Sequence, residues 1–142
     1  MATGIQVGDE CITKFTDFKL QKGDMKDVKF VIYKITDDAT QIVEDEVGEV
    51  GQDYSDLQGK LIAKGEPRYA VVDCAYTTAD GRDASKIVFI AWVPDTCKIK
   101  QKMVYSGSKD ALKRALLGIM CDINATDESE LDFDSCIKVK LC

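Results

Sequence analysis

The sequence predicts a single α/β domain in which helices pack over one sheet. Two runs dense in β-branched and aromatic residues, 28–35 and 86–93, predict buried strands, whereas the stretch 92–120 contains a long segment with helical spacing of its apolar residues. The chain has 142 residues, which suffice for one domain with its own core and are too few for two ordinary domains. No repeat, low-complexity segment or linker divides the sequence, so we expect one domain over residues 1–142.

The N-terminal part of the sequence divides into an arm and a helix. Residues 1–7 are expected to form a flexible, extended polar arm. From 8 to 20, Cys11, Phe15 and Phe18 recur at i, i+4 and i+7, a spacing that predicts a short amphipathic helix with one face on the core.

A pair of strands and a helix are predicted next. The segment 28–35 predicts a central strand, and the more polar and acidic segment 42–47 predicts a strand nearer the edge of the sheet. A hairpin across 36–41 is the simplest connection between them. The short helix that follows is capped by either Asp53 or Ser55, because both are favoured N-cap residues.

A second strand pair is predicted at 68–76 and 86–93. The polar segment between them carries an Asp-Gly turn at Gly81, which predicts a projecting hairpin. After the long helix, alternation of apolar and polar residues in 121–125 predicts a further strand, and a final short helix is expected around 133–140.

The long helix is basic although the chain has a formal net charge of −6. Between residues 96 and 114, six cations stand against Asp110 alone. When the segment is projected at about 100° per residue, four lysines and one aromatic residue fall within an arc of roughly 80°. These residues are Lys98, Lys102, Tyr105, Lys109 and Lys113. We expect them to form an outward cationic ridge interrupted by an aromatic ring.

The apolar residues of this helix behave differently in its two halves. Leu112 and Leu116 follow the spacing of a core-facing stripe, whereas Ile99 and Met103 lie away from the ridge. A bend is predicted at 106–108, because glycine and serine together are among the known causes of helix kinks. The N-terminal half would then project outward while the C-terminal half docks on the core.

The composition argues against catalysis. The sequence has no histidine, no phosphate-binding glycine loop, and no C-x-x-C pair among its six cysteines. The acidic run 44–46 resembles a carboxylate dyad or a cation site, but such runs on polar strands are more often plain surface. We expect no enzyme activity, no metal and no cofactor. A thiol-dependent enzyme remains the weakest alternative, because no cysteine has an activating partner in the sequence.

Charge and hydropathy also limit the partners and the location. The net charge of −6 disfavours general binding of nucleic acid, which needs a broad basic surface. The longest apolar run, 87–93, is far shorter than a bilayer span, and the N-terminus lacks the pattern of a signal peptide. We therefore expect a cytoplasmic protein. A row of lysines on a helix is often only a solvated face, but the contrast of charge with the remaining chain favours a binding surface here.

Several separated motifs resemble the actin-depolymerising factor/cofilin family, and they occur in the order of that family. They are TGIQVGDECITKF, RYAVVDCAY, GRDASKIVFIAW, WVPDT followed by KMVYSGSKDALKRAL, and INATDESEL. The resemblance covers nearly the whole chain. It implies the actin-depolymerising-factor homology fold, a central mixed sheet of five to six strands flanked by helices on both faces. It also implies binding of actin monomers and filaments without catalysis, with preference for ADP-actin.

The resemblance further implies an actin-monomer site made of the N-terminal arm and the long helix. The matching residues are Thr3, Gly4, Ile5, Lys100, Lys102, Met103, Tyr105, Lys109, Asp110, Lys113 and Arg114. Thr3 stands where the family commonly has a phosphorylatable serine, and a phosphate there would weaken binding by adding negative charge. Phosphoinositide binding is implied for the basic set Lys98, Lys100, Lys102, Lys109, Lys113 and Arg114.

The sequence departs from the family pattern at the second, filament-side site. Arg82 and Lys86 of the projecting hairpin match it, as do Lys138 and Lys140 near the C-terminus, but acidic residues dilute the hairpin's charge. Filament severing is therefore expected to be weaker than monomer binding. The expected protein is a monomer that promotes filament turnover at the actin cytoskeleton. The alternative is a phosphoinositide- or polyanion-binding adaptor without actin activity.

Overall fold

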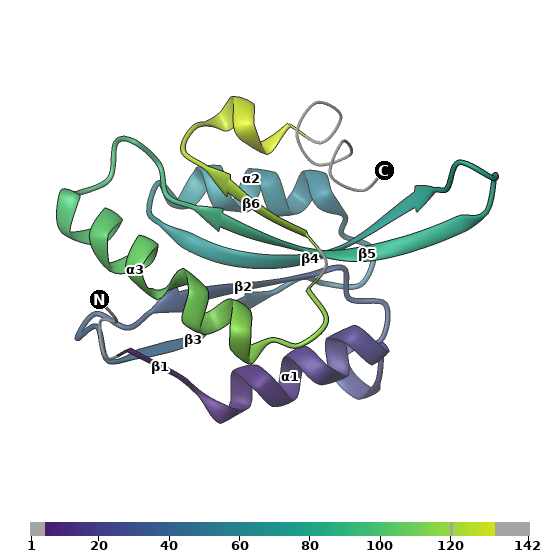
Figure 1. Ribbon diagram of the computed structural model, residues 1–142, viewed down its shortest axis with the longest axis horizontal. Coiled ribbons are helices and arrows are strands. Elements are labelled where there is room, and N and C mark those ends of the chain that lie inside the picture. The colour runs from purple at the N-terminus through teal and green to yellow at the C-terminus, as the bar shows by residue number, and fades with distance from the viewer. Residues whose placement is uncertain (1–4, 120, 133–142) are drawn as a thin grey trace.

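The computed structural model describes residues 5–119 and 121–132, which form a six-stranded sheet with helices on both faces (Figure 1). The strands lie in the order β1-β3-β2-β4-β5-β6. They are β1 (Gln6–Val7), β2 (Phe30–Ile35), β3 (Gln41–Val47), β4 (Arg68–Thr77), β5 (Asp83–Trp92) and β6 (Cys121–Ala125). The outermost pairs, β1 with β3 and β5 with β6, are parallel, and the inner pairs are antiparallel. The predicted mixed sheet is confirmed.

In the described part of the chain, three α-helices cover the sheet. Helices α1 (Asp9–Leu20) and α3 (Ile99–Ala115) pack on one face, and α2 (Tyr54–Lys64) packs on the other (Figure 1). Two 3₁₀ helices complete the described elements, η1 (Gly23–Met25) after α1 and η2 (Glu128–Leu131) on the face of α2. Helix α3 is the crossover from β5 to its parallel neighbour β6, which brings the long helix beside that edge strand.

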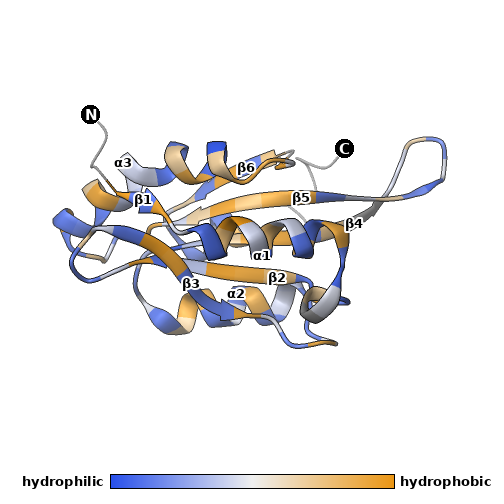
Figure 2. Cartoon of the chain, turned by 90° about the horizontal axis from the view of Figure 1, so that it is seen from below, coloured by the Kyte–Doolittle hydropathy of each residue, from blue (hydrophilic) through white to orange (hydrophobic). Residues whose placement is uncertain are grey.

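The core has one apolar layer on each face of the sheet. On the face of α1 and α3, Phe15 and Phe18 of α1 and Leu112 of α3 belong to one cluster with buried residues of the sheet. On the opposite face, Leu57 and Leu61 of α2 form the second layer. Figure 2 shows the apolar central strands running between the helices, and the hydrophilic tip of the β4–β5 hairpin extending beyond them. The predicted core faces of the first helix and of the long helix are therefore confirmed.

Helix α2 begins at a capping box. The Asp53 carboxylate accepts a hydrogen bond from the backbone N–H of Ser55 at 3.0 Å, and the Asp56 carboxylate accepts one from the backbone N–H of Asp53 at 3.0 Å. At the other end, Gly65 adopts a left-handed conformation with φ of 63°, which favours glycine. Of the two predicted caps, Asp53 is the one used.

The N-terminal arm is shorter than predicted. Ile5 is buried in the core, and Gln6 and Val7 form β1, so the expected flexible arm over residues 1–7 is wrong in its last part. The backbone N–H of Gln6 donates to the Thr40 carbonyl at 3.0 Å. A strand of two residues is too short to show any alternation, so β1 could not be predicted from periodicity. The predicted helix at 133–140 lies outside the described residues.

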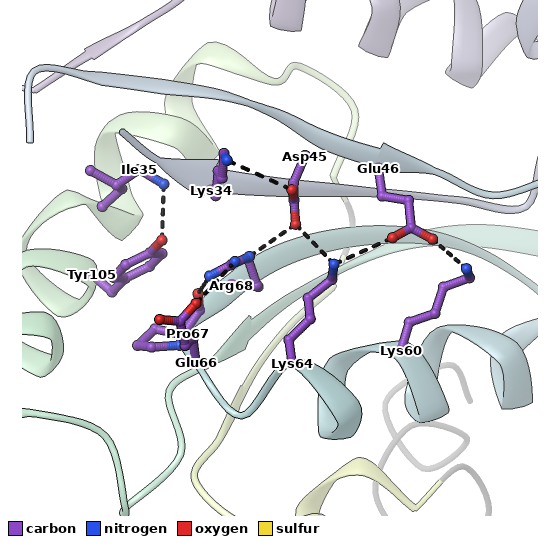
Figure 3. A network of polar contacts seen from close by, with 10 residues as sticks. All are labelled: Lys34, Ile35, Asp45, Glu46, Lys60, Lys64, Glu66, Pro67, Arg68 and Tyr105. Carbon is purple, nitrogen blue, oxygen red and sulfur yellow. Dashed lines mark hydrogen bonds and ion pairs between the residues drawn. The ribbon is translucent and has the colours of Figure 1, made fainter. Parts of the chain in front are cut away.

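A polar network fastens β3 to α2 and β4 (Figure 3). The Asp45 carboxylate lies 3.0 Å from Nε of Arg68 and 3.2 Å from Nζ of Lys64. The neighbouring Glu46 carboxylate pairs with Lys60 and lies 3.3 Å from Nζ of Lys64. These ion pairs join α2 to the acidic side of β3, so this contact is polar rather than apolar.

The acidic run 44–46 is accounted for by its basic neighbours. Its first member, Glu44, pairs with Nζ of Lys14 on α1 at 2.9 Å, and the other two belong to the network around Lys64. Within residues 5–119 and 121–132 there is no group of three or more histidine, cysteine, aspartate or glutamate side chains that could hold a metal ion. The carboxylates therefore act as ion-pair partners of two helices.

The network predicts an acid-dependent loss of stability. Burial opposes ionisation of Asp45, but hydrogen bonds from Arg68 and Lys64 outweigh it and hold the pKa below its ordinary value. A lowered folded-state pKa stabilises the fold above the unfolded pKa and ceases to do so as the pH falls through the folded value. Asp45→Asn is expected to lower the free energy of unfolding by about 1–2 kcal/mol at pH 7. Urea unfolding between pH 7 and pH 2 should show that the difference in the free energy of unfolding between the variant and the wild type disappears below about pH 4. A gap independent of pH would contradict the role of charge.

Candidate functional site

The outward face of α3 combines apolar, small and charged residues. Ile99 is 75% exposed and Met103 is 69% exposed, although both are large apolar side chains. They stand four residues apart, and Gly107, Asp110 and Arg114 continue the same face one turn after another as exposed residues. Exposed apolar groups rimmed by polar ones are typical of protein-binding surfaces. We call the exposed set Lys98, Ile99, Lys100, Met103, Gly107, Asp110 and Arg114 the α3 face.

Tyr105 is not part of this face, and its prediction as an outward aromatic contact is wrong. Its side chain is 5% exposed and packs on Tyr69 with ring centroids 5.1 Å apart. The Tyr105 hydroxyl accepts a hydrogen bond from the backbone N–H of Ile35 at 2.9 Å (Figure 3), and the Tyr105 carbonyl accepts one from the Tyr69 hydroxyl. Tyr105 therefore fastens α3 to β2 and β4.

Two further members of the predicted ridge, Lys109 and Lys113, turn toward β6. Nζ of Lys109 lies 2.9 Å from the side-chain oxygen of Asn124, and Nζ of Lys113 lies 3.1 Å from the Asp122 carboxylate. Both lysines, like Lys102, are only partly exposed. The predicted lysines therefore form a row along one flank of α3, but the C-terminal part of the row pairs with the edge strand, and only Lys98 at its beginning is exposed.

Helix α3 is continuous through 106–108, where a bend was predicted. The Tyr69 hydroxyl donates to the backbone carbonyl of Tyr105, one residue before this segment. Insertion of a side chain among the backbone hydrogen bonds of a helix is a known cause of bending. Ser108 is buried, whereas the preceding Gly107 is exposed on the outer face. The bend itself stays a prediction.

A polar groove separates the start of α3 from the β2–β3 turn. It encloses about 320 Å³ and its walls include Lys100 and Val104 of the helix, Thr36 of the turn, and Arg68 at the start of β4. Because Gln6 pairs beside this turn, the described start of the chain lies close to this groove. Thr3 and Gly4 lie outside the described residues, and Ile5 is buried rather than free for contact.

Two of the predicted filament-side residues, Arg82 and Lys86, belong to the β4–β5 hairpin, which projects away from α3 (Figure 1). Arg82 is exposed and forms an ion pair with Asp80 at 2.9 Å, which offsets its charge locally. Lys86 is partly exposed on β5. Lys138 and Lys140 lie outside the described residues, so the structure brings together only the hairpin part of this predicted set.

The thiols of the described residues are suited to packing rather than to nucleophilic chemistry. Cys11 and Cys74 are buried free thiols, and burial raises the pKa of both, that of Cys74 to about 12. Burial also raises the pKa of the partly exposed Cys97. A thiol with a raised pKa holds little thiolate near neutral pH, so none of these three is an activated nucleophile.

In residues 5–119 and 121–132, no helix is both long and apolar enough to cross a membrane.

Comparison with known proteins places this site in context. The profile of the cofilin/tropomyosin-type actin-binding proteins matches residues 4–140. Actin-depolymerizing factor 3 of Arabidopsis thaliana is 40% identical, with 94% of this chain and 92% of the relative covered. Cofilin of Gibberella zeae is also 40% identical, over 96% and 93% of the two chains. The crystal structure of Streptomyces griseoflavus cofilin superposes with a TM-score of 0.82 at 33% identity, over 95% of this chain and 96% of that one.

Proposed function

We propose that this chain, which belongs to the actin-depolymerising factor/cofilin family, binds actin through the α3 face and promotes depolymerisation of actin filaments. The names and the family description of its relatives support actin binding and depolymerisation. Preference for ADP-actin, binding to both monomers and filaments, and weaker severing are the finer parts of the proposal. The protein acts as a monomer in the cytoplasm, at the actin cytoskeleton.

The observation that carries the proposal is the exposure of Ile99 and Met103 beside cations on an acidic protein. Two large apolar side chains, 75% and 69% exposed, supply area that a partner can desolvate. Lys98 and Lys100 flank them in the chain, Arg114 lies toward the end of the same face, and all three cations are exposed. Cations at the rim of such a patch steer an acidic partner into register, and actin is acidic. The proposed contact set keeps Lys100, Met103, Asp110 and Arg114 and adds Ile99.

Two sedimentation measurements test the proposal. The protein should pellet with actin filaments and should raise the amount of actin left in the supernatant, more with ADP-actin than with ATP-actin. Imaging of single filaments then separates severing from loss of subunits at the ends. A chain that neither pellets with filaments nor changes the soluble actin pool would contradict the proposed function.

Substitution of the two cations of the β4–β5 hairpin is expected to affect filament binding and not monomer binding. Lys86→Ala together with Arg82→Ala is expected to reduce filament binding by a few-fold, because each removes one exposed or partly exposed cation. Binding to monomers should stay unchanged, since the hairpin lies away from α3 (Figure 1). Pelleting with filaments measures filament binding, and fluorescence titration of monomeric actin measures monomer binding. An equal loss in both assays would contradict a separate filament-side site.

Phosphoinositide binding is a second proposed activity, favoured by the exposed Lys98 and Lys100 at the start of α3. Clustered lysines attract anionic lipid head groups, and this attraction weakens with salt. Vesicles containing phosphatidylinositol bisphosphate should therefore compete with actin for the α3 face. Vesicle binding without any effect on actin would favour the adaptor alternative instead.

Modification of Thr3 is proposed as a switch for actin binding. Thr3 lies three residues before Gln6, whose backbone pairs beside the groove at the start of α3, so an added phosphate is expected to place negative charge near the actin contact. Thr3→Glu should lower actin affinity, and Thr3→Ala should leave it unchanged. Equal affinity of the two variants in a monomer titration would contradict the switch.

A further inference from the structure

We infer that Lys109 and Lys113 are positioning residues, which hold α3 to Asn124 and Asp122 of β6 as a two-rung ladder and so orient the α3 face. This inference rests on the proposed actin binding. It replaces the expectation that both lysines contact actin, and it assigns a role to two residues of β6 for which the sequence suggested none.

The ladder is defined by two contacts of matched spacing. The lower rung joins Nζ of Lys113 to the Asp122 carboxylate at 3.1 Å, and the upper rung joins Nζ of Lys109 to the Asn124 oxygen at 2.9 Å. Four residues of a helix rise by about 6.0 Å, and two residues of a strand by about 6.6 Å, so the two rungs repeat at nearly the same interval. The residue order is reversed between the partners, as expected where a helix runs antiparallel to the strand that follows it.

The apolar contacts of α3 leave one degree of freedom that the ladder removes. The side chains of Leu112 and Leu116 are buried and fix the distance of the helix from the sheet. Apolar contact is non-directional, however, and resists rotation about the helix axis only weakly. Hydrogen bonds and ion pairs are directional. Two of them on one flank, together with the Tyr105 hydroxyl bonded to the Ile35 N–H on β2, set the rotation of the helix.

The direction of the α3 face depends on that rotation. Asp110 and Arg114 each follow a ladder lysine by one residue, which is about 100° around the helix. Both are exposed, whereas Lys109 and Lys113 are partly covered and already paired with β6. A small rotation of α3 would turn these two residues and Met103 away from a flat partner surface.

A charge swap tests the ladder against direct contact. Lys113→Glu and Asp122→Lys are each expected to weaken actin binding about tenfold, and the double variant Lys113→Glu with Asp122→Lys should recover to within about threefold of the wild type. If Lys113 itself met actin, the double variant would stay as weak as Lys113→Glu, and that result would overturn the inference. Arg114→Glu is the matched control: it should weaken binding, and Asp122→Lys should not rescue it.

Amide hydrogen exchange without actin separates this inference from the proposed function. Each single variant should speed exchange in the C-terminal half of α3, and the double variant should restore the wild-type rates. Unchanged exchange in both single variants would overturn the ladder even if actin binding fell. A wild-type chain that fails to bind actin would instead refute the proposed function, while the exchange rates would still test the ladder.

Discussion

Lys100→Ala combined with Met103→Ala is expected to weaken actin binding by about 2–3 kcal/mol, which is roughly 30- to 150-fold. Met103 supplies apolar area that is 69% exposed in the free protein and would be desolvated by a partner. Lys100 is exposed beside it, so one substitution removes contact area and the other removes a steering charge. Titration of labelled monomeric actin gives the dissociation constants directly.

The same double variant should keep its stability. Both side chains face solvent, and surface substitutions away from caps and buried networks change the free energy of unfolding by less than about 0.5 kcal/mol. The matched control removes a lysine and an exposed leucine elsewhere, Lys26→Ala with Leu20→Ala, and should bind actin as the wild type does. Equal losses in the test and control variants would show that the α3 face has no special part in binding.

Tyr105→Ala is expected to lower the free energy of unfolding by about 3–5 kcal/mol, the usual cost of deleting a buried aromatic side chain. The variant loses the ring packed on Tyr69 and leaves the backbone N–H of Ile35 without its hydroxyl partner. Urea unfolding monitored by circular dichroism measures the change. An outward, partner-binding Tyr105 would instead leave stability unchanged and reduce only actin affinity.

Tyr105→Phe separates the two parts of this effect. The ring remains, so the apolar packing is kept, and only the acceptor for the Ile35 N–H is removed. A buried backbone donor left without a partner costs about 1–3 kcal/mol. A loss as large as that of Tyr105→Ala would mean that the hydroxyl, and not the ring, fixes the helix to the sheet.

Sequence periodicity predicted most of the fold because it reports which face of an element meets the core. The spacing of Phe15 and Phe18, and of Leu112 and Leu116, fits the burial of those residues in the structure. It failed where an element was too short to show a period, as in β1. It also failed where polar geometry decided between alternatives, as at Asp53, because side-chain hydrogen bonds leave no periodic trace.

The candidate site was only partly predictable for a related reason. A helical projection placed Tyr105 among lysines, since all of them share one flank, but it carries no information about what lies beside that flank. The structure puts β6 and β2 there, so the lysines pair with the strand and the ring enters the core. Spacing identified Ile99 and Met103 only as lying away from the ridge, and Met103 entered the predicted contact set through the family resemblance. Exposed apolar residues on a helix whose buried face is already accounted for are the signal that identifies such a surface.

Oxidation of Met103 with and without actin tests most directly whether the α3 face is the actin contact. The thioether is exposed in the free protein, so hydrogen peroxide should oxidise it readily, and mass spectrometry can follow its rate at this single position. We expect saturating monomeric actin to slow oxidation of Met103 by at least about tenfold, because a desolvated hot-spot side chain is closed to solvent. An unchanged oxidation rate at Met103 in a sample where actin is demonstrably bound would contradict the account.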